Sequence, residues 1–178
     1  MPYLIWFLLI FPSVFMAVFG RLICPILPFF VQEDGHLPKC LSWFDTPFDT
    51  ADGDEGHQER WPGTDRRSTY KRRVAWYWRN CAYGFDMRVC GIKVNPDTDQ
   101  IIYEGNPDIG DDTEISGKCK WFAYRDGELI AWQFYYVKHY SLFGLDKCVR
   151  IGLGWKIWSE EKLYDEPAQY WIYFNPVK

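Results

Sequence analysis

The sequence predicts a mainly β protein that begins with a long apolar helix. Three observations predict this class: an uncharged apolar run near the N-terminus, one short basic segment with helical periodicity, and a series of β-branched and aromatic runs after Gly84. The 178 residues suffice for one domain with a hydrophobic core and an appendage. No alternation of strands and helices is present, which disfavours doubly wound nucleotide-binding folds.

The pattern divides the chain into four segments. They are a hydrophobic membrane-anchor segment (residues 1–31), a Pro/Gly/Asp-rich connector (32–64), a basic amphipathic helix (65–84) and an antiparallel β domain (85–178). Aromatic residues make up 20% of the chain, with 10 Trp. Such large side chains must be buried or must meet a membrane interface.

Residues 3–19 contain no charged side chain, and the apolar run resumes after Arg21. At about 1.5 Å per residue, a helix from residue 3 to about 23 spans a bilayer core if the Arg21 side chain extends to the interface. Pro25 and Pro28 predict its end. A cleaved signal peptide is disfavoured because no basic residue precedes the run. A buried core helix is the alternative that the pattern leaves open.

Charge is distributed unevenly along the chain, whose formal net charge is −4. Between Arg60 and Arg79, seven basic residues accompany one acidic residue, whereas eleven basic and fifteen acidic residues follow from Phe85 onward. Positive charge favours the cytoplasmic side of a membrane span. Arg21, Lys39 and the basic segment therefore predict that the β domain lies in the cytoplasm.

The connector contains an acidic stretch, residues 43–57, that raises the question of a metal site. A calcium loop needs several oxygen ligands at set spacings. Counted from Asp52, the fifth and twelfth positions are Gly56 and Gly63, which breaks the pattern. A solvated, turn-rich loop is therefore the favoured interpretation. The weak metal candidates are Asp49, Asp52 and Asp54.

The basic segment predicts a short amphipathic helix that ends near Gly84. At 100° per residue, one arc of this helix carries Tyr70, Val74, Tyr77, Trp78 and Cys81. Basic and aromatic side chains of this type bind single-stranded nucleic acid or anionic headgroups, and the neighbouring membrane segment favours headgroups. The membrane-interface candidates are Arg66, Arg67, Lys71, Arg72, Arg73, Trp76, Trp78 and Arg79.

The C-terminal segment predicts an antiparallel meander, either a curled sheet or a small barrel-like sandwich. About six strands are expected, in MRVCGIKV, QIIYEG, KCKWFAY, LIAWQFYYVKHY, CVRIGLGWKIW and QYWIYF. Two hairpins are expected, one at Asn95–Pro96–Asp97 and one at the favoured two-residue turn Asp126–Gly127. In the fifth run, the alternation from Val149 to Ile157 indicates a core face, and Gly152 and Gly154 indicate strong curvature or a close neighbour on the other face.

A candidate partner surface lies on the even face of the fourth run. Its aromatic residues exceed what one sheet face usually needs. They also fit the competing interpretation that this face is core. The residues are Trp132, Phe134 and Tyr136.

No enzymatic motif is present. The sequence lacks G-x-S-x-G, H-E-x-x-H and a phosphate-binding glycine loop, and its three histidines are scattered. The six cysteines form no C-x-x-C spacing and lie mostly in apolar runs, which favours reduced, buried thiols. We expect no catalytic residue and no cofactor. A metal-dependent enzyme, the least favoured alternative, would need an ion at the acidic stretch or at residues 106–117.

Two motifs resemble an uncharacterised family of small tailed-bacteriophage proteins with an N-terminal hydrophobic segment. The connector motif matches at Trp43, Phe44, Thr46, Pro47, Asp52, Gly53 and Asp54. The second motif matches at Trp78, Arg79, Asn80, Ala82, Tyr83, Gly84, Phe85 and Asp86. Phe48 departs from the connector motif, where an Asp is expected. The resemblance implies a phage origin and assigns no catalytic or binding residue.

The combined expectation is a phage-encoded accessory protein at the host inner membrane, which binds membrane lipid and a protein partner from host or phage. The alternative is a virion component whose apolar N-terminus is buried against other subunits. Nucleic acid is not a favoured partner.

Overall fold

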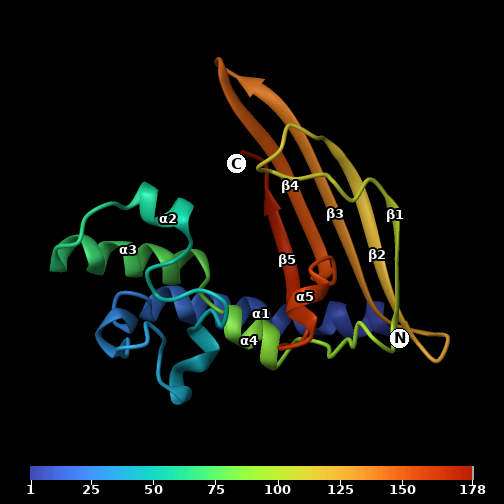
Figure 1. Ribbon diagram of the computed structural model, residues 1–178, viewed down its shortest axis with the longest axis horizontal. Helices are drawn as coiled ribbons and strands as arrows, with labels where there is room; N and C mark the ends of the chain where they lie inside the picture. Colours follow the sequence, from blue (N-terminus) through green and yellow to red (C-terminus); the bar gives the residue numbers. More distant parts are fainter. Residues whose placement is uncertain (178) are drawn as a thin grey trace. The chain divides into compact units, whose positions relative to one another are not determined.

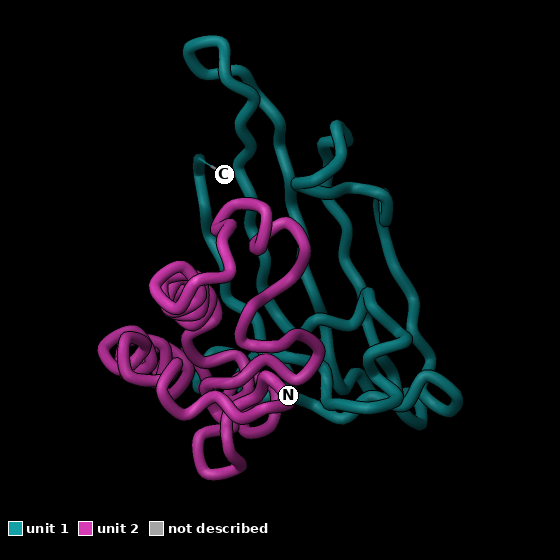
Figure 2. The backbone as a smooth tube through the Cα atoms, turned by 60° about the vertical axis from the view of Figure 1, so that its left-hand side comes forward, with its two compact units in different colours: residues 1–8, 91–178 teal, residues 9–90 magenta. Residues whose placement is uncertain are grey.

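The computed structural model describes residues 1–177 and divides the chain into two compact units. Unit 1 comprises residues 1–8 and 91–178, and unit 2 comprises residues 9–90 (Figure 2). Helix α1 (Pro2–Ile23) contributes residues to both units. The other elements of unit 2 are η1 (Leu27–Phe30), η2 (Lys39–Phe44), α2 (Glu55–Arg60), α3 (Arg66–Arg79) and α4 (Tyr83–Arg88). Those of unit 1 are β1 (Gln100–Gly105), β2 (Gly117–Arg125), β3 (Glu128–Leu142), β4 (Leu145–Trp155), α5 (Glu160–Leu163) and β5 (Tyr170–Asn175) (Figure 1).

Unit 1 is built on a five-stranded antiparallel sheet with the order β1-β2-β3-β4-β5 (Figure 1). Each strand pairs with its neighbour in sequence, as a series of strands separated by turns predicts. The predicted fold class, an apolar N-terminal helix followed by an antiparallel meander, is confirmed. Of the two predicted forms, the described residues adopt the open sheet and not a closed barrel.

The run MRVCGIKV, predicted as the first strand, is not a strand. Met87 and Arg88 belong to helix α4, and Ile92 forms only an isolated bridge with Ala168. The hairpin predicted at residues 95–97 is therefore also wrong, because the residues before this turn do not form a strand. Phe85 and Met87 are buried in unit 2. A short apolar run does not distinguish a strand from a buried helical turn by periodicity, which explains the error.

Two-residue turns connect β2 to β3 and β3 to β4. Asp126 and Gly127 have φ angles of 50° and 81°, and Phe143 and Gly144 have nearly the same angles, 52° and 78°. These left-handed values belong to the hairpin turn that favours Asn-Gly or Asp-Gly. The predicted hairpin at Asp126–Gly127 is confirmed, whereas the second turn places phenylalanine where a small polar residue is usual.

The sheet has one deeply buried face. Along β3 its residues are Ala131, Gln133, Tyr135 and Val137. On β4 the same face contains Gly152, where a side chain would overlap the ring of Trp171. The close neighbour predicted at Gly152 is therefore confirmed. The core face predicted from Val149 to Ile157 is confirmed at Trp155 and Ile157, which are fully buried. It is corrected at Val149, Ile151 and Leu153, because the aromatic rings fill the glycine face and leave these three residues half-buried.

Unit 2 is organised around helix α3. The carboxylate of Asp65 caps its N-terminus by accepting hydrogen bonds from the backbone of Arg67 and Ser68. Trp76 and Tyr77 are buried on its inner face. The indole of Trp76 donates to Thr46 Oγ1 at 3.0 Å, so residues of the Asp-rich segment form part of this core.

Candidate membrane-binding surface

Helix α1 has a covered stripe and a wide outward face. The covered stripe recurs every three or four residues, as one helix face does, and consists of Pro2, Trp6, Leu9, Ser13, Met16 and Gly20. The outward face is exposed and apolar: Leu4, Ile5, Phe7, Leu8, Phe11, Val14, Phe15, Val18 and Leu22. The helix is long and apolar enough to cross a membrane, yet only 17% of its apolar window is buried. A core helix of a soluble protein would be covered on most of its surface.

The first turns of α1 pack on the sheet of unit 1. The indole of Trp6 donates to the carbonyl of Trp171 at 3.3 Å, and the hydroxyl of Tyr170 donates to the carbonyl of Trp6 at 3.2 Å. The rings of Tyr3 and Trp6 lie 5.0 Å and 5.3 Å from that of Trp132. These contacts make the start of the helix part of the fold of unit 1.

The later turns of α1 pack within unit 2. A side chain at Gly20 would overlap the carbonyl oxygen of Cys81, so the helix backbone lies directly against this segment. The ring of Phe19 is 5.9 Å from that of Phe44. The guanidinium of Arg21 lies 6.0 Å from the ring centre of Trp78, a contact at the outer limit of cation–π attraction.

The apolar surface continues beyond α1 into η1. Ile26, Phe29 and Phe30 are exposed, Phe29 at 69%. The ring of Phe29 lies 5.5 Å from that of Tyr70, whose hydroxyl donates to the carbonyl of Pro25 at 3.0 Å. The same unit therefore presents exposed apolar side chains beside helix α3.

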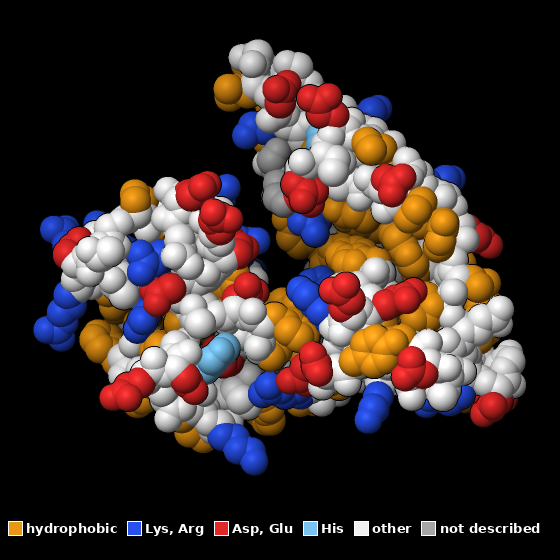
Figure 3. Space-filling view, viewed as in Figure 1, with side chains coloured by type: hydrophobic (Ala, Val, Ile, Leu, Met, Phe, Trp, Pro, Cys, Tyr) orange, Lys and Arg blue, Asp and Glu red, His pale blue; other side chains and the backbone are white. Residues whose placement is uncertain are grey.

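Three of the predicted membrane-interface residues lie exposed on α3 as expected for lipid contact. They are Arg66, Arg67 and Lys71. Trp78 is also exposed, at 56%. Basic side chains project from α3 in the space-filling view (Figure 3). These four residues and Arg79, which is exposed but also has the contacts described below, form the accessible part of the predicted set.

Arg72 and Arg73, by contrast, face inward and bind Asp52. Their guanidinium nitrogens lie 2.8 Å and 2.9 Å from its carboxylate oxygens. Partial burial alone would raise the pKa of Asp52, but the hydrogen bonds and charges of Arg73 and Arg72 outweigh it and lower the pKa. This carboxylate, one of the weak metal candidates, is thus already neutralised by two arginines.

The remaining predicted residues of this region also have structural contacts. Trp76 is buried, and the guanidinium of Arg79 lies 5.3 Å from its ring centre and 3.6 Å from a carboxylate oxygen of Asp54. Asp54 caps α2 by accepting from the backbone of His57, and Asp49 accepts the Thr46 hydroxyl through its backbone carbonyl. Within residues 1–177, no group of three or more His, Cys, Asp or Glu side chains could hold a metal ion.

The predicted partner surface is divided by its contacts. Trp132 is packed by Tyr3 and Trp6, as described above, and so contributes to folding. Phe134 and Tyr136, further along β3, are half-buried. Exposed Ile172 and Phe174 on β5 belong to the same side of the sheet, because their partners in β4, Leu153 and Ile151, pair with Phe134 and Tyr136.

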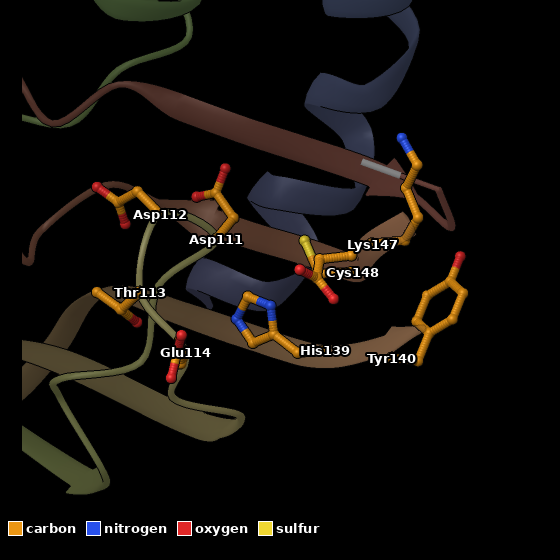
Figure 4. Close-up of a pocket in the computed structure, with 9 residues that line it drawn as sticks. Asp111, Asp112, Thr113, Glu114, His139, Tyr140, Lys147 and Cys148 are labelled. Atoms are coloured by element: carbon orange, nitrogen blue, oxygen red, sulfur yellow. The ribbon is translucent and has the colours of Figure 1, made fainter. Parts of the chain in front are cut away.

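A hollow of about 510 Å³ lies in unit 1, between an acidic loop and strands β3 and β4 (Figure 4). Its lining residues are Asp111, Asp112, Thr113, Glu114, His139, Tyr140, Asp146, Lys147 and Cys148. Asp111 accepts from Arg150 at 3.1 Å and from the Tyr135 hydroxyl at 3.1 Å. His139 Nε2 lies 2.9 Å from the carbonyl of Gly110. These internal hydrogen bonds fix the loop.

The exposed tip of the β3–β4 hairpin was not predicted from the sequence. Phe143 is 96% exposed and is flanked by exposed Leu142 and Leu145. Figure 1 shows this hairpin extending beyond the other strands. The signal in the sequence is the dipeptide Phe143–Gly144, which stands in a turn where Asn-Gly or Asp-Gly is favoured.

All six cysteines are free, and five are buried. Burial raises the pKa of the Cys81 thiol, and it raises that of Cys90 to about 12. Only Cys40 is exposed. The expectation that the cysteines are mostly buried is confirmed.

The chain belongs to a family of unknown function, DUF7338, whose model matches residues 1–178. No curated protein and no solved structure matches the chain. The expectation of an uncharacterised family is confirmed by the match over the whole chain. Because the family has no assigned activity, the outward face of α1 and the basic residues of α3 are the basis for a functional argument.

Proposed function

We propose that this chain is a membrane-associated accessory protein that acts through protein–protein contacts and not through catalysis. The observation that supports this proposal is the outward face of α1. Its residues include Phe11, Phe15 and Leu22, which are 68%, 69% and 73% exposed. An exposed apolar surface of this kind is costly in water and is typical of a membrane or protein interaction site.

The proposed membrane is the inner membrane of a bacterial host, with the sheet on the cytoplasmic side. The similarity of the two sequence motifs to tailed-bacteriophage proteins supports a phage origin. The positions of Arg21, Lys39 and the basic α3 next to the apolar helix support the cytoplasmic side, because the cytoplasmic leaflet carries a negative surface potential that attracts basic residues. Exclusion of a second phage or modulation of a host membrane factor are processes that such a protein could serve.

The proposed protein contacts lie in unit 1. Phe134 and Tyr136 are half-buried on the sheet, and Phe143 is fully exposed at the hairpin tip. Aromatic anchors that fill a pocket of a partner contribute most to typical interfaces. The left-handed backbone of Phe143 supports this site, because a 96% exposed aromatic residue kept in an unfavourable conformation suggests a role outside its own fold.

Flotation with liposomes tests the proposed function. The full-length chain is compared with the variant Phe11→Ser/Phe15→Ser, which alters only the outward face. A deletion of residues 1–31 is unsuitable, because Trp6 and Gly20 belong to the folded units. We expect the wild-type chain to float and the variant to stay in the soluble fraction with an unchanged circular dichroism spectrum.

A virion component is the alternative, with the same outward face covered by other subunits. In that case the wild-type chain would form large particles without lipid and would not float. If the chain were then detected in purified virions, the virion alternative would hold in place of the membrane proposal.

A further inference from the structure

We propose that helix α1 lies in the plane of an anionic bilayer surface and does not cross it, with basic residues of α3 at the lipid headgroups. This inference rests on the proposed function, because it requires that α1 contacts lipid. It adds the orientation of the helix and the chemistry of the lipid. The outward face enters the boundary between headgroups and acyl chains of one leaflet, while the covered stripe stays packed on the protein.

Both ends of α1 are attached to folded polypeptide, which disfavours a helix that crosses the bilayer. Near its start, Trp6 exchanges hydrogen bonds with Trp171 and Tyr170. Near its end, Gly20 lies against the backbone of Cys81. A helix that crosses a bilayer is surrounded by about 30 Å of hydrocarbon. Crossing would therefore break these contacts or draw the attached segments into lipid.

The attached segments are unsuited to hydrocarbon. Phe44, which contacts Phe19, is followed by buried Asp45, whose carboxylate lies 3.0 Å from the ring of His36. Arg79 lies two residues before Cys81. Ionisable side chains are strongly disfavoured in the bilayer core. An in-plane helix keeps these groups on the water side and places only its outward face in lipid.

The apolar face of α1 ends at a border that carries a tryptophan and a basic side chain. Residues 1–20 contain no Asp, Glu, Lys or Arg, and Arg21 beside Trp78 is the first charged side chain. Tryptophan and basic residues are enriched at the membrane interface. The border therefore has the composition expected where an apolar surface meets headgroups.

Helix α3 carries accessible positive charge that complements anionic headgroups. At 100° per residue, Arg67, Lys71 and Trp78 lie within about 40° of one another around the helix. Neighbouring Tyr70 contacts Phe29 of the apolar surface. In the described part of the chain, neither Arg67 nor Lys71 forms an ion pair. The guanidinium of Arg67 and the ammonium of Lys71 are thus available to bind lipid phosphates.

Spin labels measure the orientation of the helix directly. Four outward residues along α1 are replaced singly by cysteine in the full-length Cys40→Ser background: Leu4, Phe11, Phe15 and Leu22. The other five cysteines are buried, and the background protein without a new cysteine is the labelling control. Depth is read by electron paramagnetic resonance in vesicles of phosphatidylglycerol and phosphatidylcholine in equal parts.

The in-plane orientation predicts that all four labels lie at one depth, roughly 5–10 Å below the headgroups. A spanning helix would place the labels at Phe11 and Phe15 near the bilayer centre and those at Leu4 and Leu22 near opposite surfaces. That graded profile would overturn this inference and leave the proposed function intact. A wild-type chain that binds no vesicles would overturn both.

The lipid chemistry is tested with the variant Arg67→Gln/Lys71→Gln. Its partition into vesicles containing phosphatidylglycerol should fall about tenfold or more, with little change for pure phosphatidylcholine. The matched control is Lys138→Gln/Lys147→Gln on the β3–β4 hairpin of unit 1, which should leave partition unchanged. The assignment of headgroup binding to α3 would be overturned if both variants lost partition equally, or if Arg67→Gln/Lys71→Gln lost none.

Discussion

The two faces of helix α1 are both largely apolar, but they differ in the size of their side chains. The covered stripe includes the small residues Ser13 and Gly20, through which a helix backbone approaches its neighbours closely. The outward face carries bulky Phe11, Phe15 and Leu22. Apolar composition alone therefore does not separate residues that hold the fold from residues that are free to meet a partner.

Helix α3 repeats this division with charged residues. Arg72 and Arg73 bind Asp52 inside unit 2, whereas Arg67 and Lys71 point outward. The sequence pattern assigned all four to a membrane interface. The comparison shows that a basic run supplies both internal ion pairs and accessible charge, and only the contacts tell which is which.

The largest effect is expected at Gly20, the closest point of the covered stripe. Gly20→Leu forces a side chain into the carbonyl of Cys81, a backbone group that cannot move aside, so we expect a loss of at least about 3 kcal/mol in the free energy of unfolding. Chemical denaturation in mild detergent measures it. Leu22→Ala on the outward face is the control and should change the free energy by less than about 0.5 kcal/mol. Equal effects at the two positions would remove the distinction between the faces.

The next largest effect is expected at Trp132, which lies under the first turns of α1. Trp132→Ala removes the ring that contacts Tyr3 and Trp6 and should cost about 3 kcal/mol. Urea unfolding followed by circular dichroism measures the loss. Tyr136→Ala, on the same strand face but half-buried, should cost about 1 kcal/mol. If the Trp132 variant is as stable as the wild type, this residue does not contribute to the fold and is again a candidate for the partner surface predicted from the sequence.

A smaller effect is expected at Asp52, which distinguishes the inward from the outward basic residues of α3. Asp52→Asn removes the charge that pairs with Arg72 and Arg73 and should cost about 2 kcal/mol at pH 7. The folded-state pKa of Asp52 is lowered. The ion pair therefore contributes fully to the free energy of unfolding above the unfolded pKa of about 3.9, and this contribution disappears as pH falls through the folded-state pKa.

Unfolding curves between pH 7 and pH 3 provide the measurement for Asp52. The wild type and Asp52→Asn should converge in stability toward the acidic end of this range. Arg67→Gln, on the outward side, should match the wild type at every pH. A constant difference between wild type and Asp52→Asn from pH 7 to pH 3 would show that the cost comes from packing and not from the ion pair.

The sequence predicted the apolar helix and the antiparallel meander because both depend on periodicity within one segment. It assigned MRVCGIKV to a strand because eight residues with mixed apolar spacing fit a strand and a short helix equally well. It placed Arg72 and Arg73 at the membrane because the partner, Asp52, lies about twenty residues away in the chain, and no local pattern reveals such a pair. Local signals thus gave the elements, and distant contacts decided which side chains remain accessible.

The hairpin tip was missed for a different reason, since its signal is local but is a departure from a preference. Asp126 and Phe143 have nearly equal φ angles, 50° and 52°, and each is followed by glycine. Aspartate tolerates this left-handed conformation, whereas an aromatic residue is strained in it. The same backbone turn is therefore built once with a favourable residue and once with an unfavourable one.

The smallest expected change is a gain of stability at this tip. Phe143→Asn relieves the left-handed strain and removes an exposed ring without losing an internal contact, so the free energy of unfolding should rise by about 1 kcal/mol. Asp126→Phe, the reciprocal change, should lower it by a similar amount. If Phe143→Asn is instead destabilising, the ring contributes to the fold and the tip resembles the covered stripe. If it is stabilising and also weakens recovery of a protein partner from membranes, Phe143 belongs with the outward residues, whose identity the fold alone does not explain.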